Sequence, residues 1–239
     1  MDRRKFLKLA CAGAPALAGL VPATAGAAGE RKPRYGMVID LRRCVGCQSC
    51  SVSCSVENRV PVGHFRATVG EFFVDEDGTP TVATLPRLCN HCEEPACVPV
   101  CPVHATFKAA NGLVLVDSAK CLGCGFCVQA CPYDARYLNP ATGTADKCTF
   151  CLHRLEAGLL PACVENCVGG ARVFGDLNDP ESLVRRTLDA HKDDARVLAP
   201  EMKTKPNVYY INLDAFLASP ANVGLPMAEG ARPAGGEHA

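Results

Sequence analysis

Apolar residues gather in short runs that are separated by glycine, proline, asparagine and aspartate. Residues 35–41 (YGMVIDL) and 171–174 (ARVF) are two such runs, and their apolar, β-branched content predicts strands. Runs of this length are shorter than a typical helix. The pattern therefore predicts an α+β chain in which short strands and loops prevail.

Two further pairs of runs face each other across turn residues. A glycine that follows aspartate or asparagine supplies the positive backbone φ that tight hairpins need. Both pairs are therefore predicted to form β-hairpins. They are residues 66–74 and 79–85, which flank DEDG at 75–78, and residues 105–107 and 113–116, which flank NG at 111–112.

The last quarter of the chain is predicted to hold one helix and one strand. Asp179 followed by Pro180 is typical of an N-cap and the first helical position, and an apolar stripe follows at residues 183, 184, 188 and 197. Residues 207–213 have the pattern of a strand. From residue 219 the tail is rich in Ala, Pro and Gly and is predicted to be loosely ordered or docked on a partner.

The chain is electrically balanced, with 25 Lys and Arg against 25 Asp and Glu. The chain thus lacks the excess of basic residues that is typical of nucleic-acid-binding proteins, so no nucleic acid is expected as a partner. The first 25 residues hold four basic groups and one acidic group, which leaves 21 basic and 24 acidic residues for the body. Aromatic residues make up only 6% of the chain, so small residues and cysteines must fill much of its interior.

The basic groups near the N-terminus belong to an export-signal pattern. The run RRKFLK at residues 3–8 resembles a twin-arginine (Tat) signal, although Asp2 stands where Ser or Thr is usual. An apolar run at 9–21 and small-residue cleavage sites near 23–27 complete the pattern. We expect residues 1–27 to be a Tat-type signal peptide, with an uncleaved membrane anchor as the alternative. Cys11 lies inside this segment and is interpreted as a bystander.

Seventeen cysteines stand out in the composition, and sixteen of them lie beyond the predicted signal in four groups of four. Every group ends in the same C-x3-C interval, while the earlier gaps vary, which is the mark of an internal repeat tied to ligand geometry. The groups are Cys44, Cys47, Cys50 and Cys54; Cys89, Cys92, Cys97 and Cys101; Cys121, Cys124, Cys127 and Cys131; and Cys148, Cys151, Cys163 and Cys167.

Three interpretations of these groups compete. Exported proteins with many cysteines are commonly disulfide scaffolds, but a tight loop with three cysteines cannot direct every sulfur toward a distant partner. Zinc sites use paired C-x2-C knuckles, which the fourth group alone resembles and the triplets do not. The run C-x2-C-x2-C-x3-C-P is the signature of a [4Fe–4S] cluster. The third group matches it through Pro132, and the first matches its spacing with Ser55 in place of proline.

The residues between the cysteines suit this interpretation. Gly46, Gly123 and Gly125 lie between predicted ligands, where a side chain would block the backbone N–H groups that turn toward the sulfurs. Neighbouring apolar residues limit solvent access, which helps to set a cluster's potential. The sequence therefore predicts four [4Fe–4S] clusters as the cofactors.

The ligand sets follow from the rule that the fourth cysteine of a ferredoxin motif binds the other cluster of its pair. The second and third groups are contiguous, both end in Cys-Pro, and together resemble a complete two-cluster ferredoxin. By the same rule the first and fourth groups form a second, split pair. The predicted sets are set 1, Cys44, Cys47, Cys50 and Cys167; set 2, Cys89, Cys92, Cys97 and Cys131; set 3, Cys101, Cys121, Cys124 and Cys127; and set 4, Cys54, Cys148, Cys151 and Cys163.

The fold expected from this pairing is α+β, with two ferredoxin-like modules, one inserted in the other, and short hairpins. The predicted outer module covers residues 28–78 and 139–178, the inserted module residues 79–138, and a C-terminal extension residues 179–239.

Little else in the sequence suggests chemistry. His91, His104 and His153 lie near predicted ligands, but no group lacks a cysteine that a histidine would replace. We interpret Lys108, Lys120, Lys147 and Arg154 as solvated surface charges rather than as counter-charges for clusters. No nucleotide-binding, zinc-protease or nucleophile motif is present, so no catalytic residue and no small-molecule substrate are expected.

At this point the chain resembles a known family, the four-cluster electron-transfer subunits of molybdopterin oxidoreductase complexes. The resemblance covers residues 35–175. Within the family it is strongest to the tetrathionate reductase branch, and it rests on three stretches: DLRRCVGCQSC at 40–50, LPRLCNHC at 85–92 and KCTFCLHRLEAG at 147–158.

The resemblance implies a three-part complex of anaerobic respiration. An integral-membrane quinol-oxidising subunit would supply electrons, this chain would relay them, and a molybdopterin-containing catalytic subunit would reduce tetrathionate. With the Tat-type signal, it implies a place at the periplasmic face of the bacterial inner membrane. The same role in a polysulfide, thiosulfate or other oxyanion reductase, and a free-standing periplasmic polyferredoxin, remain as alternatives.

Overall fold

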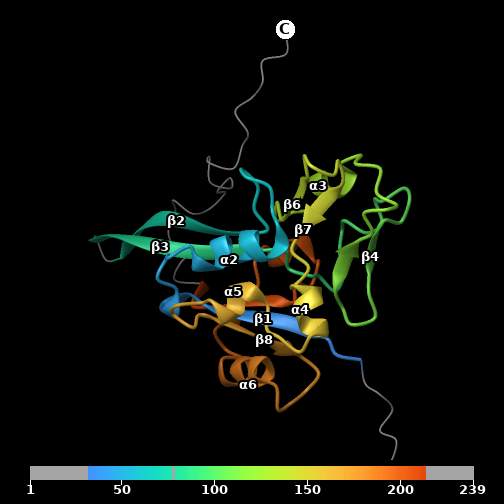
Figure 1. Cartoon of the computed structure of the whole chain (residues 1–239). Coiled ribbons are helices and arrows are strands. Elements are labelled where there is room, and N and C mark those ends of the chain that lie inside the picture. The colour runs from blue at the N-terminus through green and yellow to red at the C-terminus, as the bar shows by residue number, and fades with distance from the viewer. Residues whose placement is uncertain (1–31, 77–78, 214–239) are drawn as a thin grey trace, which may run out of the picture. The chain divides into compact units, whose positions relative to one another are not determined.

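The computed structural model describes residues 32–76 and 79–213, and its centre is a four-stranded sheet (Figure 1). The order of its strands is β8-β1-β10-β9, with β1 at Tyr35–Asp40, β8 at Arg172–Asp176, β9 at Ala195–Arg196 and β10 at Val208–Ile211. β1 runs antiparallel to β8 and parallel to β10. The strands predicted at 35–41, 171–174 and 207–213 are confirmed.

Both faces of this sheet are covered. Val38 on β1 and Ile211 on β10 pack against Val184 on one face, and Met37 and Ile39 contribute to a larger core that includes cysteines of the loops. In Figure 1, α6 (Leu183–Ala190) lies on one side of the sheet, and α5 (Ala162–Glu165) lies on the other. The sheet therefore separates a hydrocarbon layer from the cysteine loops.

Two opposed glycines let α6 approach the sheet. Gly36 on β1 pairs with Gly175 on β8. A Cβ on Gly36 would lie 2.6 Å from Cδ1 of Leu177, and one on Gly175 would lie 2.3 Å from Oγ of Ser182. Both contacts are too close for a side chain, so the segment before α6 packs directly on the backbone of the sheet.

The predicted start and length of the C-terminal helix are wrong. The N-cap is Ser182, not Asp179, and the helix ends at Ala190, before Val197. The Asp179 carboxylate instead accepts a hydrogen bond from the N–H of Glu181 at 3.0 Å, which closes a turn ahead of the helix. Aspartate followed by proline suits such a turn as well as a helix start.

Three hairpins carry the rest of the strands. The longest joins β2 (Ala67–Glu76) to β3 (Thr79–Leu88), so the hairpin predicted at 66–85 is confirmed and is longer than expected. Its tip, residues 77–78, lies outside the described residues, and the predicted module boundary falls there, between two paired strands. The hairpin predicted at 105–116 is confirmed as β4 (Thr106–Lys108) and β5 (Val114–Val116). A third hairpin, of β6 (Arg136–Leu138) and β7 (Ala145–Lys147), was not predicted.

The remaining helices are short, and most of them contain or adjoin a cysteine. They are η1 (Leu41–Arg43), α2 (Ser49–Asn58), α3 (Phe126–Gln129), α4 (Leu152–Glu156) and η2 (Pro200–Met202). The predicted signal peptide at 1–27, with Cys11, and the predicted loose tail from 219 lie outside the described residues. Within the described part, no helix is both long and apolar enough to cross a bilayer.

Candidate metal centres

The sixteen cysteines of the four groups are all free thiols in the structure. None of them forms a disulfide, although several lie close enough together to interact. The described part of the chain therefore does not have the architecture of a disulfide scaffold. Its cysteines are presented by loops and by short helices.

Three groups end in the same turn. The last cysteine of each accepts, through its carbonyl oxygen, a hydrogen bond from the N–H three residues later. That third residue has a left-handed backbone in every case, and the donor–acceptor distances are similar. The turns are Cys101 to His104 (3.2 Å, φ 53°), Cys131 to Asp134 (3.3 Å, φ 48°) and Cys167 to Gly170 (2.9 Å, φ 58°).

This turn directs one more N–H group at the sulfur. The N–H of Ala105 donates to Sγ of Cys101 at 3.2 Å, and that of Ala171 donates to Sγ of Cys167 at 3.2 Å. An alanine, Ala135, holds the equivalent place after Cys131. Such N–H groups stabilise a thiolate, and they are the kind of hydrogen bond to sulfur that adjusts the potential of an iron–sulfur centre.

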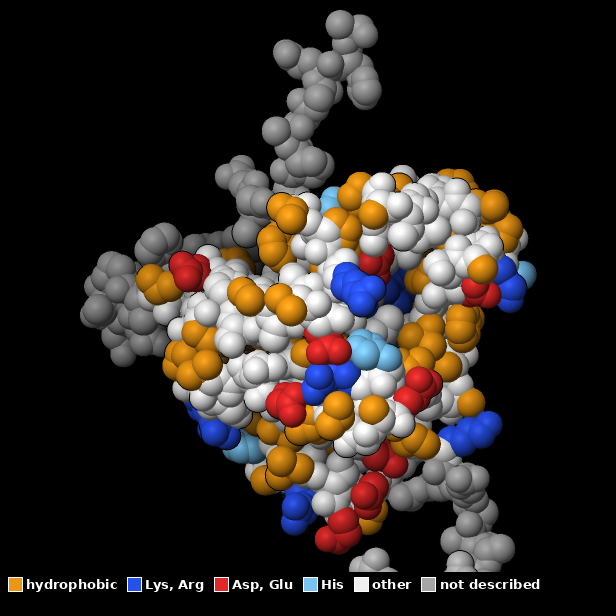
Figure 2. Space-filling view, viewed as in Figure 1, with side chains coloured by type: hydrophobic (Ala, Val, Ile, Leu, Met, Phe, Trp, Pro, Cys, Tyr) orange, Lys and Arg blue, Asp and Glu red, His pale blue; other side chains and the backbone are white. Residues whose placement is uncertain are grey.

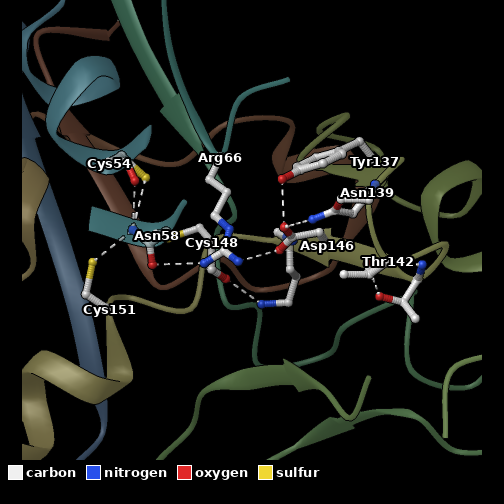
Figure 3. A network of polar contacts seen from close by, with 12 residues as sticks. Cys54, Asn58, Arg66, Tyr137, Asn139, Thr142, Asp146, Cys148 and Cys151 are labelled. Atoms are coloured by element: carbon white, nitrogen blue, oxygen red, sulfur yellow. Dashed lines mark hydrogen bonds and ion pairs between the residues drawn. The ribbon is translucent and has the colours of Figure 1, made fainter. Parts of the chain in front are cut away.

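The first group ends differently, because Cys54 lies inside α2. The side chain of Asn58 replaces the missing backbone donor, and its Nδ2 lies 3.6 Å from Sγ of both Cys54 and Cys151 (Figure 3). Arg66 donates to Oδ1 of Asn58 at 2.9 Å and pairs with Asp146 at 2.7 Å. This network fixes the orientation of the Asn58 amide and brings two cysteines of predicted set 4 to one donor.

The C-x-x-C loops share a second feature. The residue before the second cysteine has a positive φ in all four groups, and two of these residues are the predicted glycines. These residues are Gly46 (66°), His91 (42°), Gly123 (69°) and Phe150 (51°). Gly125, the third predicted glycine, also has a positive φ, 75°. The predicted glycines thus adopt a backbone conformation that favours glycine, and the other two groups reach it with bulky residues. That a side chain would block the N–H groups near the sulfurs stays a prediction.

The four cysteines of predicted set 2 line one cavity. Cys89, Cys92, Cys97 and Cys131 line it together with Tyr133, Arg136 and Thr204. Among the described residues, no three His, Cys, Asp or Glu side chains converge as the ligands of one metal ion do. The thiols of set 2 thus face a common space without meeting at a single point.

The side chain of Asn90 indicates that the cavity suits a polar ligand. This residue lies between two cysteines of the set, lines the cavity and is 1% exposed. Both polar atoms of its side chain are buried without a partner in the described part of the chain. A buried amide without a partner is costly, so a guest with hydrogen-bond acceptors, such as a cluster with sulfides, fits the site.

The cysteines of predicted set 4 are all buried, and their thiols lie near enough to interact. Burial raises the pKa of the Cys148 thiol well above its ordinary value of 9.0, and the nearby thiols of Cys54, Cys163 and Cys89 raise it further. Burial also raises the pKa of Cys54 to about 12, with contributions from Cys163 and Cys151. Thiols in such surroundings ionise readily only when nearby cations compensate the negative charge of the thiolate, which bound iron would do.

Predicted sets 1 and 3 lie nearer the surface. Cys47 and Cys124 are exposed, whereas every cysteine of set 4 is buried. Val45 is 66% exposed and Leu122 is 68% exposed, and apolar side chains reach the surface over α2 and α3 (Figure 2).

The contacts within these two outer sets differ. In set 1, Gly169 lies so close to the carbonyl oxygen of Arg43 that a Cβ would be 2.1 Å away. This contact places the turn after Cys167 against the Cys44 loop. In set 3, the side chains of Cys121 and Cys127 pack together. The assignment of Cys101 to this set follows from the sequence spacing alone.

The prediction of surface charges is wrong at Lys147, which is 1% exposed. Sequence reasoning also missed Arg136 and Arg172, which are 5% and 4% exposed and contact cysteine sulfurs. One signal was available: each arginine stands five residues after the last cysteine of a group, directly after the repeated turn described above. His91 is fully buried, and its Nδ1 accepts a hydrogen bond from the N–H of Val114 at 3.1 Å.

Comparisons with known proteins agree with this geometry. Residues 80–177 match the model of the 4Fe-4S dicluster domain. The chain is 58% identical over 194 residues to a tetrathionate reductase subunit of Salmonella typhimurium, an alignment covering 80% of this chain and 78% of that protein. It is 47% identical to a tetrathionate reductase subunit of Archaeoglobus fulgidus, covering 77% and 84%. It is 45% identical to the thiosulfate reductase electron transfer subunit of Salmonella typhi, covering 62% and 79%.

Proposed function

Since the chain belongs to the family of iron–sulfur electron-transfer subunits of tetrathionate-, thiosulfate- and dimethyl sulfoxide-type reductases, we propose that it holds four [4Fe–4S] clusters and relays electrons through them. As a member of this family, it carries [4Fe–4S] clusters, transfers electrons and is not catalytic alone. The observation that carries the count of four is the set of sixteen free thiols in four groups, one predicted set of which lines a common cavity. When bound, each cluster supplies a site that accepts and releases an electron.

The proposed ligands are the four predicted sets. Set 2 is supported by the cavity that its four cysteines line, and set 4 by the mutual effects of its thiols on their pKa values. Set 1 is supported by the contact between the turn after Cys167 and the Cys44 loop. Set 3 follows from the ferredoxin rule for crossed ligation.

Contacts between the sets support one order along the path. Arg172 contacts Cys50 of set 1 and Cys163 of set 4. Cys148 of set 4 lies near Cys89 of set 2, since the two thiols interact electrostatically. Sets 2 and 3 meet where Cys97 and Cys127 pack together. We therefore order the sites 1-4-2-3, with the exposed sets at the two ends and the buried sets between them.

This order suits the nested arrangement of two ferredoxin-like modules. Sets 1 and 4 would belong to the outer module and sets 2 and 3 to the inserted one. The two modules would then meet at sets 4 and 2. The exposed Cys47 and Cys124 loops, at opposite ends of the path, are the places where electrons would enter and leave.

The partners and the substrate belong to the same proposal. Two relatives are named as subunits of a tetrathionate reductase, which supports a partner that is the catalytic subunit of such an enzyme. We propose that this partner contains molybdopterin and that an integral-membrane subunit supplies electrons from quinol. The name of the Salmonella typhi relative supports a thiosulfate reductase as the second candidate.

The proposed location is the periplasmic face of the inner membrane. Its support is the RRKFLK motif and the apolar run that follows it. Replacing Arg3 and Arg4 with lysines should abolish export through the Tat route. Export of the doubly substituted chain at the normal level would contradict this part of the proposal.

Metal analysis tests the cofactor count. Protein purified without oxygen should contain about sixteen iron and sixteen sulfide per chain, from four clusters of four. Cys92→Ala should lower the iron content by about four, while Cys11→Ala should leave it unchanged. About eight iron in the wild-type chain, or zinc in place of iron, would contradict the proposal.

Co-purification tests the partners and the substrate. The chain should purify from membranes with a catalytic subunit whose activity is measured separately on tetrathionate and on thiosulfate. Tetrathionate reduction supports the first candidate, and thiosulfate reduction without it supports the second. A soluble monomer that exchanges electrons with many acceptors would instead indicate a free-standing polyferredoxin.

A further inference from the structure

Three buried cationic side chains occupy the boundaries between neighbouring cysteine sets. The first is Arg172, at the start of β8. Its Nη2 lies 3.6 Å from Sγ of Cys50, in set 1, and its Nη1 lies 3.9 Å from Sγ of Cys163, in set 4. One guanidinium therefore faces sulfurs of two different sets.

Arg136 repeats this arrangement between sets 2 and 3. Its Nη2 donates to Sγ of Cys97 at 3.0 Å, and its Nη1 donates to Thr106 at 3.3 Å. Its charge also interacts with the thiol of Cys127, in set 3. Arg136 begins β6 as Arg172 begins β8, five residues after the last cysteine of its group. The two arginines are therefore equivalent positions of the internal repeat.

Lys147 occupies the remaining boundary, between sets 4 and 2. Its Nζ donates to the carbonyl oxygen of Cys148, in set 4, at 2.6 Å. Its charge interacts with the thiols of Cys89 and Cys97, in set 2, as well as with that of Cys148. Each of the three boundaries in the order 1-4-2-3 thus holds one buried cation.

Within the described ranges these cations have no carboxylate partners. In residues 32–76 and 79–213, the side chains of Arg172, Arg136 and Lys147 form hydrogen bonds only with sulfur, hydroxyl or carbonyl groups. A buried charge without a counter-charge is strongly destabilising. Because the surrounding groups are cysteines, the counter-charge that fits these positions is the negative charge of thiolate-bound clusters.

We propose that Arg172, Lys147 and Arg136 are positioning residues that set the potentials along the relay, each through the two sites beside it. This proposal rests on the ligand sets proposed above. A cation between two sites stabilises the added electron on either of them, so it raises both potentials. An electron moves from one site to the next, which oxidises the first and reduces the second. No bond is formed, and these side chains transfer no proton.

Redox titration of the intact complex, followed by electron paramagnetic resonance, tests the proposal. Lys147→Met should lower the reduction potentials of two clusters. The equilibrium constant for reducing each should fall about tenfold, which corresponds to about 59 mV for a one-electron couple. Arg172→Gln and Arg136→Gln should each lower a different pair. Across the three variants, each end cluster should respond to one substitution and each central cluster to two.

Lys120→Met is the matched control. Lys120 precedes Cys121 as Lys147 precedes Cys148, but its side chain is 65% exposed and pairs with Asp117. All four potentials should stay unchanged in this variant. Equal shifts in Lys120→Met and Lys147→Met would overturn the proposal, because they would show that burial between two sites is irrelevant.

Conservative variants separate charge from packing. Lys147→Arg and the two Arg→Lys variants keep the charge and should keep potentials close to those of the wild type, even where the neutral variants lose iron. Charge-conserving variants that shift potentials as far as neutral ones would overturn the proposal. Fewer than four clusters in the wild type would overturn the proposed function itself. Four clusters with potentials insensitive to all three neutral substitutions would overturn only the role of the cations.

Discussion

Two regions of the molecule have interiors of different composition. In the sheet region, formed by β1, β8, β9, β10 and α6, Val38, Leu177, Val184 and Ile211 pack together. In the hairpin region, residues 89–147, the corresponding cluster consists of two cysteines, Cys97 and Cys127, with one valine and one alanine. Hydrocarbon burial stabilises the first region directly. The second has little hydrocarbon to bury and depends on what its thiols bind.

The short strands of the hairpin region support the same conclusion. β4, β5, β6 and β7 have three residues each and form two separate two-stranded sheets. Isolated hairpins of two strands are at best marginally stable in water. Small folds of this kind commonly need a metal or another cross-link. We therefore expect bound clusters to form the core of the hairpin region in addition to transferring electrons.

Removal of iron should produce the largest difference between the regions. Chelation under anaerobic conditions should unfold the hairpin region while the sheet region keeps most of its structure. The expected loss of stability in the hairpin region is on the order of 10 kcal/mol, the free energy that structural metal sites contribute to folding. Hydrogen exchange measures it: the amide of Val114, in β5, should lose protection, and that of Val38, in β1, should keep it. Equal loss at both amides would show that the two regions fold as one unit.

A core truncation in the sheet region should have the next largest effect, and it should spare the clusters. Ile211→Ala removes a fully buried side chain and should lower the free energy of unfolding by about 2–5 kcal/mol. Iron content should remain that of the wild type. Leu183→Ala, on α6 and 57% exposed, is the control and should change stability by less than about 0.5 kcal/mol. Iron loss in Ile211→Ala would indicate that the sheet supports the clusters directly.

The two regions also differ in how far the sequence predicts them. The sheet strands at 35–41, 171–174 and 207–213 follow from apolar runs, because burial on both faces demands such runs. Their order does not follow, and nothing in residues 207–213 predicts that they lie between β1 and β9. The cysteine spacing predicts ligand loops from local geometry alone. It does not predict Asn58 as a donor to Cys54 and Cys151, since that contact depends on the path of α2.

Buried charges mark a further limit of sequence reasoning. Lys147 and Lys120 both precede the first cysteine of a group, yet one is buried and the other exposed. The difference arises because Lys147 ends β7, beside the proposed meeting point of sets 4 and 2, whereas Lys120 lies in a turn at the surface. Packing between segments distant in sequence decides it, and local spacing carries no information about such packing.

A contact between the two regions gives a smaller effect. Thr204, just before β10, lies over the set 2 cavity and forms a hydrogen bond with the hydroxyl of Tyr133. Thr204→Val leaves that buried hydroxyl without its partner, which should cost about 1–3 kcal/mol. Iron should then be released to a chelator faster than from the wild type. Thr144→Val, which removes a surface hydroxyl bonded to Thr142, should not change the rate. Release at the same rate from both variants would show that the sheet region does not protect this cavity.

The smallest predicted effect lies at the surface of the sheet region. The Arg42 side chain, 2.8 Å from Oδ2 of Asp40, holds the pKa of Asp40 below its ordinary value of 3.8. The contribution of this ion pair to stability is therefore present above pH 3.8 and disappears as the pH falls through the lowered pKa of Asp40. Asp40→Asn keeps an oxygen to cap η1 but removes the charge, so at pH 7 it should lower stability by at most about 1 kcal/mol. Thermal unfolding between pH 7 and pH 3 should show the two proteins converging at the acidic end. A difference that persists there would assign the effect to the cap rather than to the ion pair.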